Sequence, residues 1–353
     1  MLVTGHTGFK GGWLVTWLTQ LGVEVHGYAL DPDSEQGFFN CARVTELLAS
    51  DNRGDVADLN LLHQVLEQTR PEIIFHLAAQ PLVRVAYENP QLTWQTNLMG
   101  TVNVLEAARM STTVAAVVVV TSDKVYRPRS DGKPSDEGDQ LGAPDPYSAS
   151  KAGAELVAES YQKTYPVNSS ERALRVATAR SGNVIGGGDR SWGRLLPDCI
   201  RSMTVGRPIE LRSPEAVRPW QHVLDPLAGY LLLAERLLSS DGDEFSSSWN
   251  FGPKSQHSVS VRELVTVALR AWGSSVEVVV EPDSGWPTET ELLRLDSSKS
   301  QELLGWHPKW DVKQAVDATV AWHQAHLEGQ SMDVFCRMQI QQYLSEENGG
   351  IAP

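Results

Sequence analysis

A tyrosine and a lysine four residues apart offer the clearest chemistry in this sequence. Tyr147 and Lys151 stand in the stretch PYSASKAGAEL. On a helix this spacing puts both side chains on one face, where an ammonium group stabilises a phenolate. We therefore expect Tyr147 to have a lowered pKa and to act as a base near neutral pH. A surface helix with an ordinary tyrosine and lysine is the alternative for this short pattern.

A second set of reactive side chains follows an apolar run. In the stretch AAVVVVTSDKVY, a run of small and β-branched residues is followed by Ser122, Asp123 and Lys124. Residues 114–120 predict a buried strand whose carboxyl end carries these polar groups. We expect Ser122 to donate a hydrogen bond to the substrate oxygen that Tyr147 also contacts. Asp123 and Lys124 either only end the strand or take part in proton transfer.

A glycine-rich stretch near the amino terminus predicts a phosphate-binding turn. Gly5, Gly8 and Gly11 form a GxxGxxG pattern between a short strand and a helix. Glycine lets the backbone approach a pyrophosphate, and the helix start presents its amides to it. Asp31 ends the next predicted strand, where a carboxylate binds a ribose hydroxyl and repels a 2′-phosphate. The pattern predicts NAD rather than NADP, and a plain tight turn is the alternative.

Other cofactor contacts are expected along this turn and at later strand ends. A side chain at residues 55–56 could meet the adenine, and the small residues of HLAAQ would let the backbone lie against the cofactor. The residues predicted in this way are Gly5, Thr7, Gly8, Phe9, Lys10, Gly11, Asp31, Asp55, Val56, Leu77, Ala78, Ala79, Gln80, Thr121, Tyr147 and Lys151.

Strands and helices alternate through the first half of the chain. Strands are expected at 2–5, 23–30, 71–79, 114–120 and 174–180, and helices at 12–22, 59–68, 92–110 and 147–165. Residues 32–54 are polar and are expected to be irregular apart from a short helix at VTELLA. This alternation predicts an α/β fold, a doubly wound parallel sheet of the Rossmann type. Shorter elements after residue 182 predict a smaller mixed α/β C-terminal substrate domain.

Composition excludes several classes of protein. The 353 residues suffice for two domains, and a net charge of −14 disfavours nucleic-acid binding. Cys41, Cys199 and Cys336 form no CxxC pair, so we expect no zinc site and a reducing cytoplasm. The absence of a long apolar run predicts no membrane span, and the stretch MLVTGHTGF lacks the features of a signal peptide.

Taken together, the motifs resemble the extended short-chain dehydrogenase/reductase family. In that family Ser/Thr, Tyr and Lys remove the proton of a carbinol while NAD accepts the hydride. The resemblance adds Asn97 to the cofactor site, as the asparagine that supports the lysine through a water. Five stretches are similar to the CDP-glucose 4,6-dehydratase subgroup, namely GHTGFKGGWL, TSDKVY, PYSASKAGAEL, RSGNVIGGGD and RPWQHVLDPLAGYLLLAE.

The resemblance implies a particular reaction on CDP-glucose. Tyr147 would take the proton of the 4-hydroxyl group while the C4 hydride moves to NAD. Asp123, protonated, would donate to the leaving 6-hydroxyl group, and Lys124, neutral, would remove the C5 proton. Return of the hydride to C6 would give the 4-keto-6-deoxy sugar. The implied catalytic residues are Ser122, Asp123, Lys124, Tyr147 and Lys151.

Substrate contacts are implied mainly in the second domain. Arginine suits a diphosphate because its planar group binds two oxygens. The implied set is Ser122, Asn183, Arg194, Leu195, Arg212, Arg218 and His222. His222 suits a structural role equally well. Trp192 and Gly193 depart from the subgroup pattern beside the nucleotide site, which bears on cytidine selectivity.

The resemblance also implies a division of the chain and leaves rival functions. We expect residues 1–182 to bind NAD, with a returning segment near 223–252, and residues 183–340 to bind the nucleotide sugar. The rivals are a nucleotide-sugar 4-epimerase, a 4,6-dehydratase for another nucleotide hexose, and a non-catalytic NAD-binding regulator. Helices 92–110 and 147–165 each have an apolar stripe, and the resemblance implies that a homodimer or higher oligomer pairs these helices, with cover by the protein's own second domain as the alternative.

Overall fold

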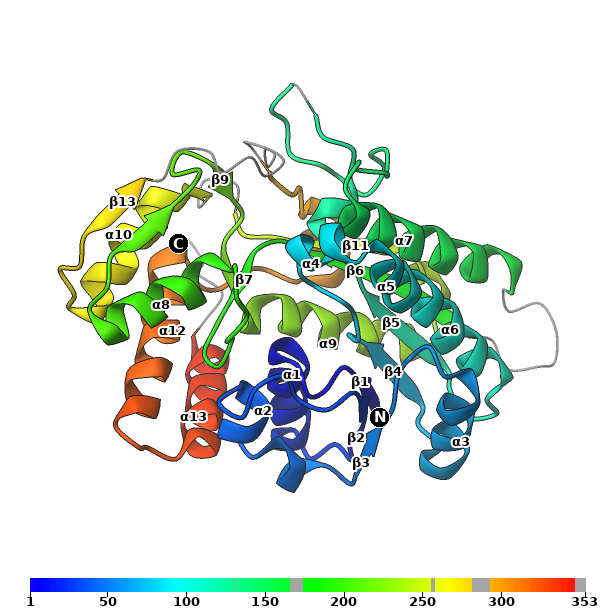
Figure 1. The fold of residues 1–353 in the computed structure, drawn as a ribbon. Helices are drawn as coiled ribbons and strands as arrows, with labels where there is room; N and C mark the ends of the chain where they lie inside the picture. Colours follow the sequence, from blue (N-terminus) through cyan, green and yellow to red (C-terminus); the bar gives the residue numbers. More distant parts are fainter. Residues whose placement is uncertain (130, 166–173, 255–257, 281–292, 347–353) are drawn as a thin grey trace, which may run out of the picture.

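A seven-stranded sheet forms the centre of the molecule (Figure 1). The computed structural model describes residues 1–129, 131–165, 174–254, 258–280 and 293–346. The strand order is β11-β6-β5-β4-β1-β2-β3, and every neighbouring pair is parallel. The predicted doubly wound α/β fold is therefore confirmed. The strands are β1 (Leu2–Thr4), β2 (His26–Ala29), β3 (Ser50–Arg53), β4 (Ile73–His76), β5 (Ala116–Val120), β6 (Arg175–Ser181) and β11 (Ser248–Phe251).

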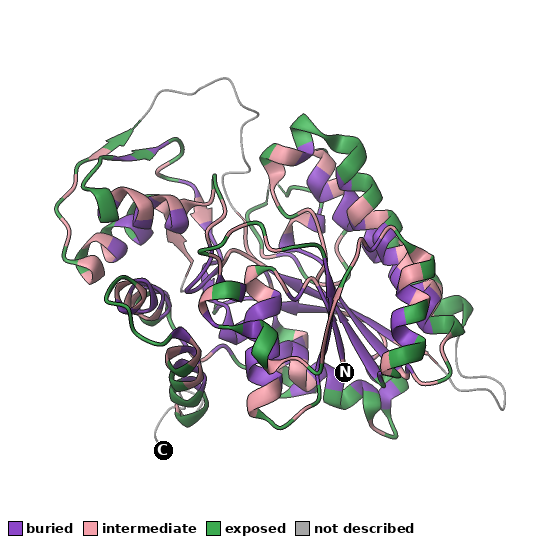
Figure 2. Ribbon diagram, turned by 60° about the horizontal axis from the view of Figure 1, so that its bottom comes forward, coloured by how far each residue is buried: buried purple, intermediate pink, exposed green. Residues whose placement is uncertain are grey.

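Helices cover both faces of the sheet because successive strand side chains point to opposite sides. Val118 and Val120 share one core with helices α1 (Phe9–Gln20), α9 (Leu224–Leu238) and α13 (Met332–Ser345). Val117 and Val119 share the other with helices α3 (Leu59–Thr69), α6 (Gly100–Met110) and α7 (Pro146–Thr164). Figure 2 shows the buried strands between helices whose outer sides are exposed. Within the described residues, no helix is long and apolar enough to span a bilayer.

The chain returns to the sheet after an excursion. Helix α9 packs on β5 and β6, and β11 pairs with β6 from Ser248 opposite Thr178 to Phe251 opposite Ser181. The segment near 223–252 thus supplies the last strand and a covering helix. Helix α13 packs on α1, and its Tyr343 hydroxyl donates a 2.9 Å hydrogen bond to a carboxylate oxygen of α9.

A smaller unit of short strands and helices lies beside the sheet, to the left in Figure 1. Its strands form three two-stranded pairs, β10 with β7, β12 with β9, and β13 with β8. Apolar side chains of α8, α10 and α12 make its separate core. The elements are β7 (Val184–Ile185), α8 (Leu195–Val205), β8 (Ile209–Leu211), β9 (Val217–Arg218), β10 (Gln221–His222), β12 (Val259–Ser260), α10 (Val261–Trp272), β13 (Val278–Val280) and α12 (Val312–Leu327), whereas α11 (Ser298–Leu304) packs on α9 and β11 of the main unit.

The secondary structure differs from the sequence-based prediction at several places. Residues 50–53 were expected to be irregular, yet they form β3 at the edge of the sheet. Their sequence, SDNR, carries no apolar signal because an edge strand here stays half-exposed. The helix predicted at 92–110 begins at Pro90 and is interrupted by a π turn, Gln95–Met99, between α5 (Pro90–Trp94) and α6. The chain also forms short helices α2 (Phe38–Cys41) and α4 (Val83–Glu88), which no pattern predicted.

Leu237→Ala should destabilise the protein because the Leu237 side chain is fully buried where α9 meets the sheet. We expect the free energy of unfolding to fall by about 2–5 kcal/mol. Leu238 is 40% exposed, so Leu238→Ala is the matched control and should change that free energy by about 0.5 kcal/mol or less. Urea unfolding followed by circular dichroism measures both, and equal losses would contradict the packing of α9 described here.

Candidate active site

Helix α7 carries the predicted tyrosine and lysine. Asp145 caps its start by accepting a 2.9 Å hydrogen bond from the Ser148 amide, and Pro146 occupies the first turn. This start fixes Tyr147 one turn before Lys151, and both side chains are buried. The Tyr147 side chain interacts with that of Ser122, whose hydroxyl acts to lower the pKa of the tyrosine. The structure therefore brings the end of β5 and the start of α7 together as the sequence predicted.

The electrostatics of this pair differ from the prediction. Burial raises the pKa of Tyr147, whereas a lowered value was expected, although the Ser122 hydroxyl opposes the rise. Lys151 donates its 3.1 Å hydrogen bond to the carbonyl oxygen of Val120. Burial lowers the pKa of Lys151 to about 8, and the nearby Glu155 carboxylate opposes this change. The dominant effect on both groups is thus loss of water, not their mutual attraction.

Asp123 is a buried acid beside this pair. It lies in the short 3-10 turn Asp123–Val125, where its Oδ1 accepts a 3.0 Å hydrogen bond from Ser122. Its Oδ2 has no hydrogen-bond partner among the described residues. A Cβ atom on Gly182 would lie 3.2 Å from that oxygen, so the glycine allows the close approach. Burial raises the pKa of Asp123, which favours a protonated carboxyl group able to donate. Lys124 follows and is half-buried.

Three cations interact with the reactive groups. The half-buried Lys10 donates to Ser181 Oγ at 3.0 Å and to the Tyr230 hydroxyl at 3.3 Å. Burial, with Arg194 and Lys151 nearby, lowers the pKa of Lys10 to about 7. The other two cations are Arg194, which interacts with Tyr147, and the buried Arg218, which interacts with Asp123.

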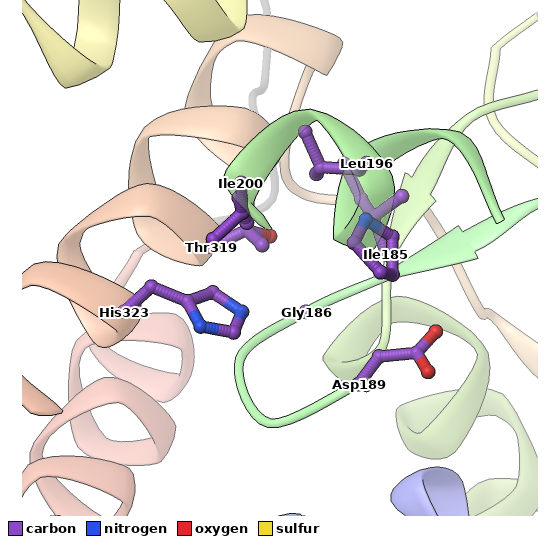
Figure 3. A pocket seen from close by; sticks show the side chains of 8 residues that line it. Ile185, Gly186, Asp189, Leu196, Ile200, Thr319 and His323 are labelled. Carbon is purple, nitrogen blue, oxygen red and sulfur yellow. The ribbon is translucent and has the colours of Figure 1, made fainter. Parts of the chain in front are cut away.

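The loop that carries Arg194 is held in place by Asp189. The Asp189 carboxylate accepts hydrogen bonds from Arg194 at 2.9 Å and from the Ser191 amide at 3.0 Å. Figure 3 shows a small pocket behind this loop, with Asp189 and the His323 ring of α12 on its sides. Burial lowers the pKa of His323 to about 3. A neutral His323 therefore packs beneath the loop, and the ion pair with Asp189 helps to orient Arg194.

The glycine-rich turn makes a cradle that side chains would fill. Gly5 has φ +74°, and a Cβ there would lie 2.6 Å from the Ala78 amide nitrogen. A Cβ on Gly11 would lie 2.2 Å from the Gly5 carbonyl oxygen. Among the described residues no side chain caps α1, so its first amides are available to an anion. This cradle fits the pyrophosphate of a dinucleotide.

Residues that follow strands β2 and β3 form the other end of the cradle. Thr7 donates a 3.0 Å hydrogen bond to the Leu30 carbonyl oxygen, which ties the turn to the end of β2. Asp31 follows with its side chain 90% exposed and 3.9 Å from Arg53. Asp55 accepts from the Ala57 amide at 2.9 Å. The predicted Phe9, Leu77 and Ala79 are half-buried, Gly8 is exposed and Val56 is buried.

Asn97 links the cofactor side of the site to α7. It lies in the π turn, a feature common at functional sites. Its side chain accepts from the Gln80 amide at 2.8 Å and donates to the Gln80 carbonyl oxygen at 3.1 Å. It also donates to Ser150 Oγ at 2.9 Å. Asn97 therefore holds the segment 77–80 against the helix that carries the reactive pair.

Two predicted substrate residues lie apart from these groups. His222 is wholly buried, with its ring centroid 6.0 Å from that of Trp13 and 4.7 Å from that of Trp310. Burial lowers the pKa of His222 to about 3, so it serves as a neutral packing group. Arg212 is exposed just after β8. Asn183 and Leu195, in contrast, are half-buried and adjoin the site in sequence. Asn183 follows Gly182, which lies against Asp123, and Leu195 follows Arg194.

A buried polar network escaped the sequence reasoning. Glu155, one turn after Lys151, pairs with Arg180 of β6 at 2.7 Å, and Arg180 donates to the Tyr126 hydroxyl at 2.7 Å. Two signals pointed to it. Glu155 continues the four-residue spacing of Tyr147 and Lys151. Arg180 is a charged residue within a strand that is buried along almost its whole length.

Comparison with known sequences places this geometry in a family. A family model described as GDP-mannose 4,6 dehydratase matches residues 2–319. A CDP-glucose 4,6-dehydratase of Salmonella typhimurium is 41% identical over 347 residues, which cover 98% of this chain and 96% of that protein. A dTDP-glucose 4,6-dehydratase of Xanthomonas campestris is 26% identical, with 91% and 92% covered.

Solved structures share the fold. A dTDP-glucose 4,6-dehydratase of Streptomyces venezuelae, in complex with NAD, has a TM-score of 0.78 at 26% identity and covers 93% of this chain and 98% of its own. A UDP-glucose 4-epimerase of Thermus thermophilus, also with NAD, has a TM-score of 0.77 at 25% identity, covering 92% and 98%. The chain belongs to the GDP-mannose 4,6 dehydratase family, a family of nucleotide-sugar 4,6-dehydratases among the extended short-chain dehydrogenases/reductases.

Proposed function

We propose that this protein converts CDP-glucose to CDP-4-keto-6-deoxyglucose with NAD as its cofactor. The observation that carries the proposal is the buried acid Asp123, which accepts a hydrogen bond from Ser122 and lies close to Tyr147. An epimerase needs the tyrosine but has no step that uses a second acid. The relative that shares 41% identity is named for this substrate, which favours cytidine over the other bases.

NAD suits the cradle formed by Gly5, Gly8 and Gly11, with Asp31 placed for the adenosine ribose. The NAD named in the structures of similar dehydratases and epimerases supports this choice. Bound NAD would accept a hydride from C4 of the sugar and return it to C6. The chain's own residues supply the proton transfers.

Tyr147 takes the proton of the 4-hydroxyl group as C4 is oxidised. Ser122 holds the same oxygen through its hydroxyl, and the Lys151 charge favours the phenolate form of the base. Because burial raises the pKa of Tyr147, the base must gain stabilisation when the site fills. The positive charge of Arg194 already opposes the rise in the pKa of Tyr147 before substrate binds.

Asp123 and Lys124 carry out the elimination. The 4-keto group acidifies the C5 proton, Lys124 removes it, and Asp123 protonates the departing 6-hydroxyl group. Burial holds Asp123 in the protonated form that this step needs. Arg194 and Arg218 are the cations we assign to the substrate diphosphate.

We also propose the division of labour between the two units. Residues 1–182 with the returning segment near 223–252 bind NAD, and the rest of 183–340 binds the nucleotide sugar.

The three cysteines are unpaired, which suits the reducing cytoplasm in which we place the enzyme.

A homodimer suits the outer faces of α5–α7. These helices pack side by side at the right of Figure 1, and they expose large apolar side chains away from the sheet. Leu156 is 58% exposed, Met99 47%, Leu92 42% and Trp94 39%. Two copies that pair these faces would cover the apolar side chains in a four-helix arrangement.

Tyr147→Phe should abolish turnover because the base is lost while the ring stays. We expect kcat to fall by about 100-fold or more. The assay follows the alkaline absorbance of the 4-keto-6-deoxy product with CDP-, dTDP-, GDP- and UDP-glucose, of which CDP-glucose should react fastest. Tyr165→Phe, at the exposed C-cap that follows the same helix, is the control. Full activity in Tyr147→Phe would favour a different site, and 4-epimer as the product would favour an epimerase.

Asp123→Asn should stop the elimination but not the oxidation. We expect product formation to fall by about 100-fold or more while the absorbance of reduced cofactor rises on the enzyme. Lys124→Ala should give a similar loss, with Lys133→Ala on the exposed loop as control. If Lys124→Ala keeps full turnover, Lys124 is not the base.

Leu156→Glu should separate the proposed dimer by placing a charge on the outer face of α7. Sedimentation equilibrium should give twice the chain mass for the wild type and one chain mass for the variant. Leu303→Glu, at a 57% exposed position on α11, is the control and should leave the mass unchanged. A wild-type monomer would refute the proposal.

A further inference from the structure

Three consecutive residues at the end of β5 each face a different turn of α7. Lys151 donates to the Val120 carbonyl oxygen, Thr121 donates to Glu155, and Ser122 interacts with Tyr147. Two of these pairs contain the groups assigned to catalysis. The middle pair joins a hydroxyl and a carboxylate that take no part in the proposed chemistry. It lies between the other two along the strand, so a shift of Thr121 would move both reactive contacts.

Glu155 is held by more than Thr121. It is 3% exposed, its Oε1 accepts the Thr121 hydroxyl, and its Oε2 accepts from Thr178 at 2.7 Å and from Arg180 at 2.7 Å. Arg180 in turn donates to the Tyr126 hydroxyl, which donates to Asn250 of β11 at 2.7 Å. The carboxylate is therefore fixed from β5, β6 and, through Arg180, from β11.

Stability alone does not account for this arrangement. Removing two charges from water is costly, and a well-packed apolar pair is often at least as stable as a buried ion pair. A buried hydrogen-bonded network does, however, fix the relative positions of the segments it joins, and here both carboxylate oxygens of Glu155 are bonded while Arg180 Nε has no partner among the described residues. The segments joined here are the end of β5, with Thr121, and the third turn of α7.

The charge of Glu155 also acts on Lys151. Besides Glu155, the titratable groups that face Lys151 among the described residues include Tyr147, one turn earlier on α7, Lys10 of α1 and His76 of β4. Lys10 is a cation, and burial lowers the pKa of His76 to about 3, so His76 is neutral. Glu155 is thus the anion among the groups facing Lys151 that favours its protonated form against burial.

We propose that Glu155 is a positioning residue for the reaction, which holds the end of β5 against α7 through Thr121 and keeps Lys151 protonated. This role rests on the proposed function, because it acts through Tyr147 and Lys151. It differs from a purely structural role in what it does to the pH dependence of turnover.

Glu155→Gln tests the proposal because it removes the charge with little change of shape. We expect kcat to fall about 10- to 100-fold, with KM for CDP-glucose nearly unchanged. The alkaline limb of the kcat profile should move about one unit to lower pH, because Lys151 loses its proton more readily. Glu159→Gln is the matched control, since Glu159 lies one turn further on α7 and pairs with Lys163 at the surface.

Thr121→Val provides an independent test, because Glu155→Gln leaves Arg180 buried without its anion and could lower the yield of folded protein. Thr121→Val removes one hydroxyl and keeps the ion pair. It should lower kcat by about 10-fold without moving the alkaline limb. Wild type and Tyr147→Phe are assayed alongside, so a failure of the proposed function shows as wild-type inactivity.

Two results would overturn the proposal in an active wild type. One is a kcat close to that of the wild type in Thr121→Val. The other is a folded Glu155→Gln whose alkaline limb stays where it was, which would leave Glu155 a structural role only. If Glu155→Gln does not fold, the kcat of Thr121→Val decides alone.

Discussion

The parallel pairing of β5 between β4 and β6 is the constraint on which the candidate site depends. Its five residues are buried on both faces, so the strand can end only where the helix layers stop covering it. Ser122 and Asp123 follow at that point. Helix α7 packs back on the sheet with Tyr147 and Lys151 facing them. The reactive groups come from one strand end and one helix start because the sheet holds both rigidly.

Burial sets the chemistry of the groups that meet there. Removing water raises the pKa of Asp123 and lowers the pKa values of Lys10 and Lys151. Acids and amines are therefore pushed toward their neutral forms in the same small volume. The ionic groups that remain, such as Arg194 with Asp189, are those with a partner at hydrogen-bond distance. The site can thus hold a proton donor and proton acceptors close together without large repulsion.

Local patterns were sufficient for the five inner strands of the sheet, the glycine turn and the reactive pair. The alternation of apolar runs gave the strands near the centre, and the four-residue spacing put Tyr147 and Lys151 on one face. The polar edge strand β3 carried no such signal, because half-exposed strands need few apolar residues. The pKa of Tyr147 could not be predicted either, since it depends on burial by segments distant in sequence. The Glu155 network was missed for the same reason, as Arg180 and Tyr126 reach it from two other segments.

The interleaving of the chain has a consequence for its synthesis on the ribosome. Strand β6 pairs with β11 on its outer side, and α13 completes the layer over α1 by bonding Tyr343 to Asp225 of α9. The amino-terminal half therefore emerges with β6 as an open edge and α1 partly bare, and both wait for segments made much later. Such long-range pairing slows folding and leaves unpaired strand edges prone to association. A nascent chain stalled before residue 248 should accordingly depend on chaperones, although all the residues of its glycine turn and reactive pair are already present.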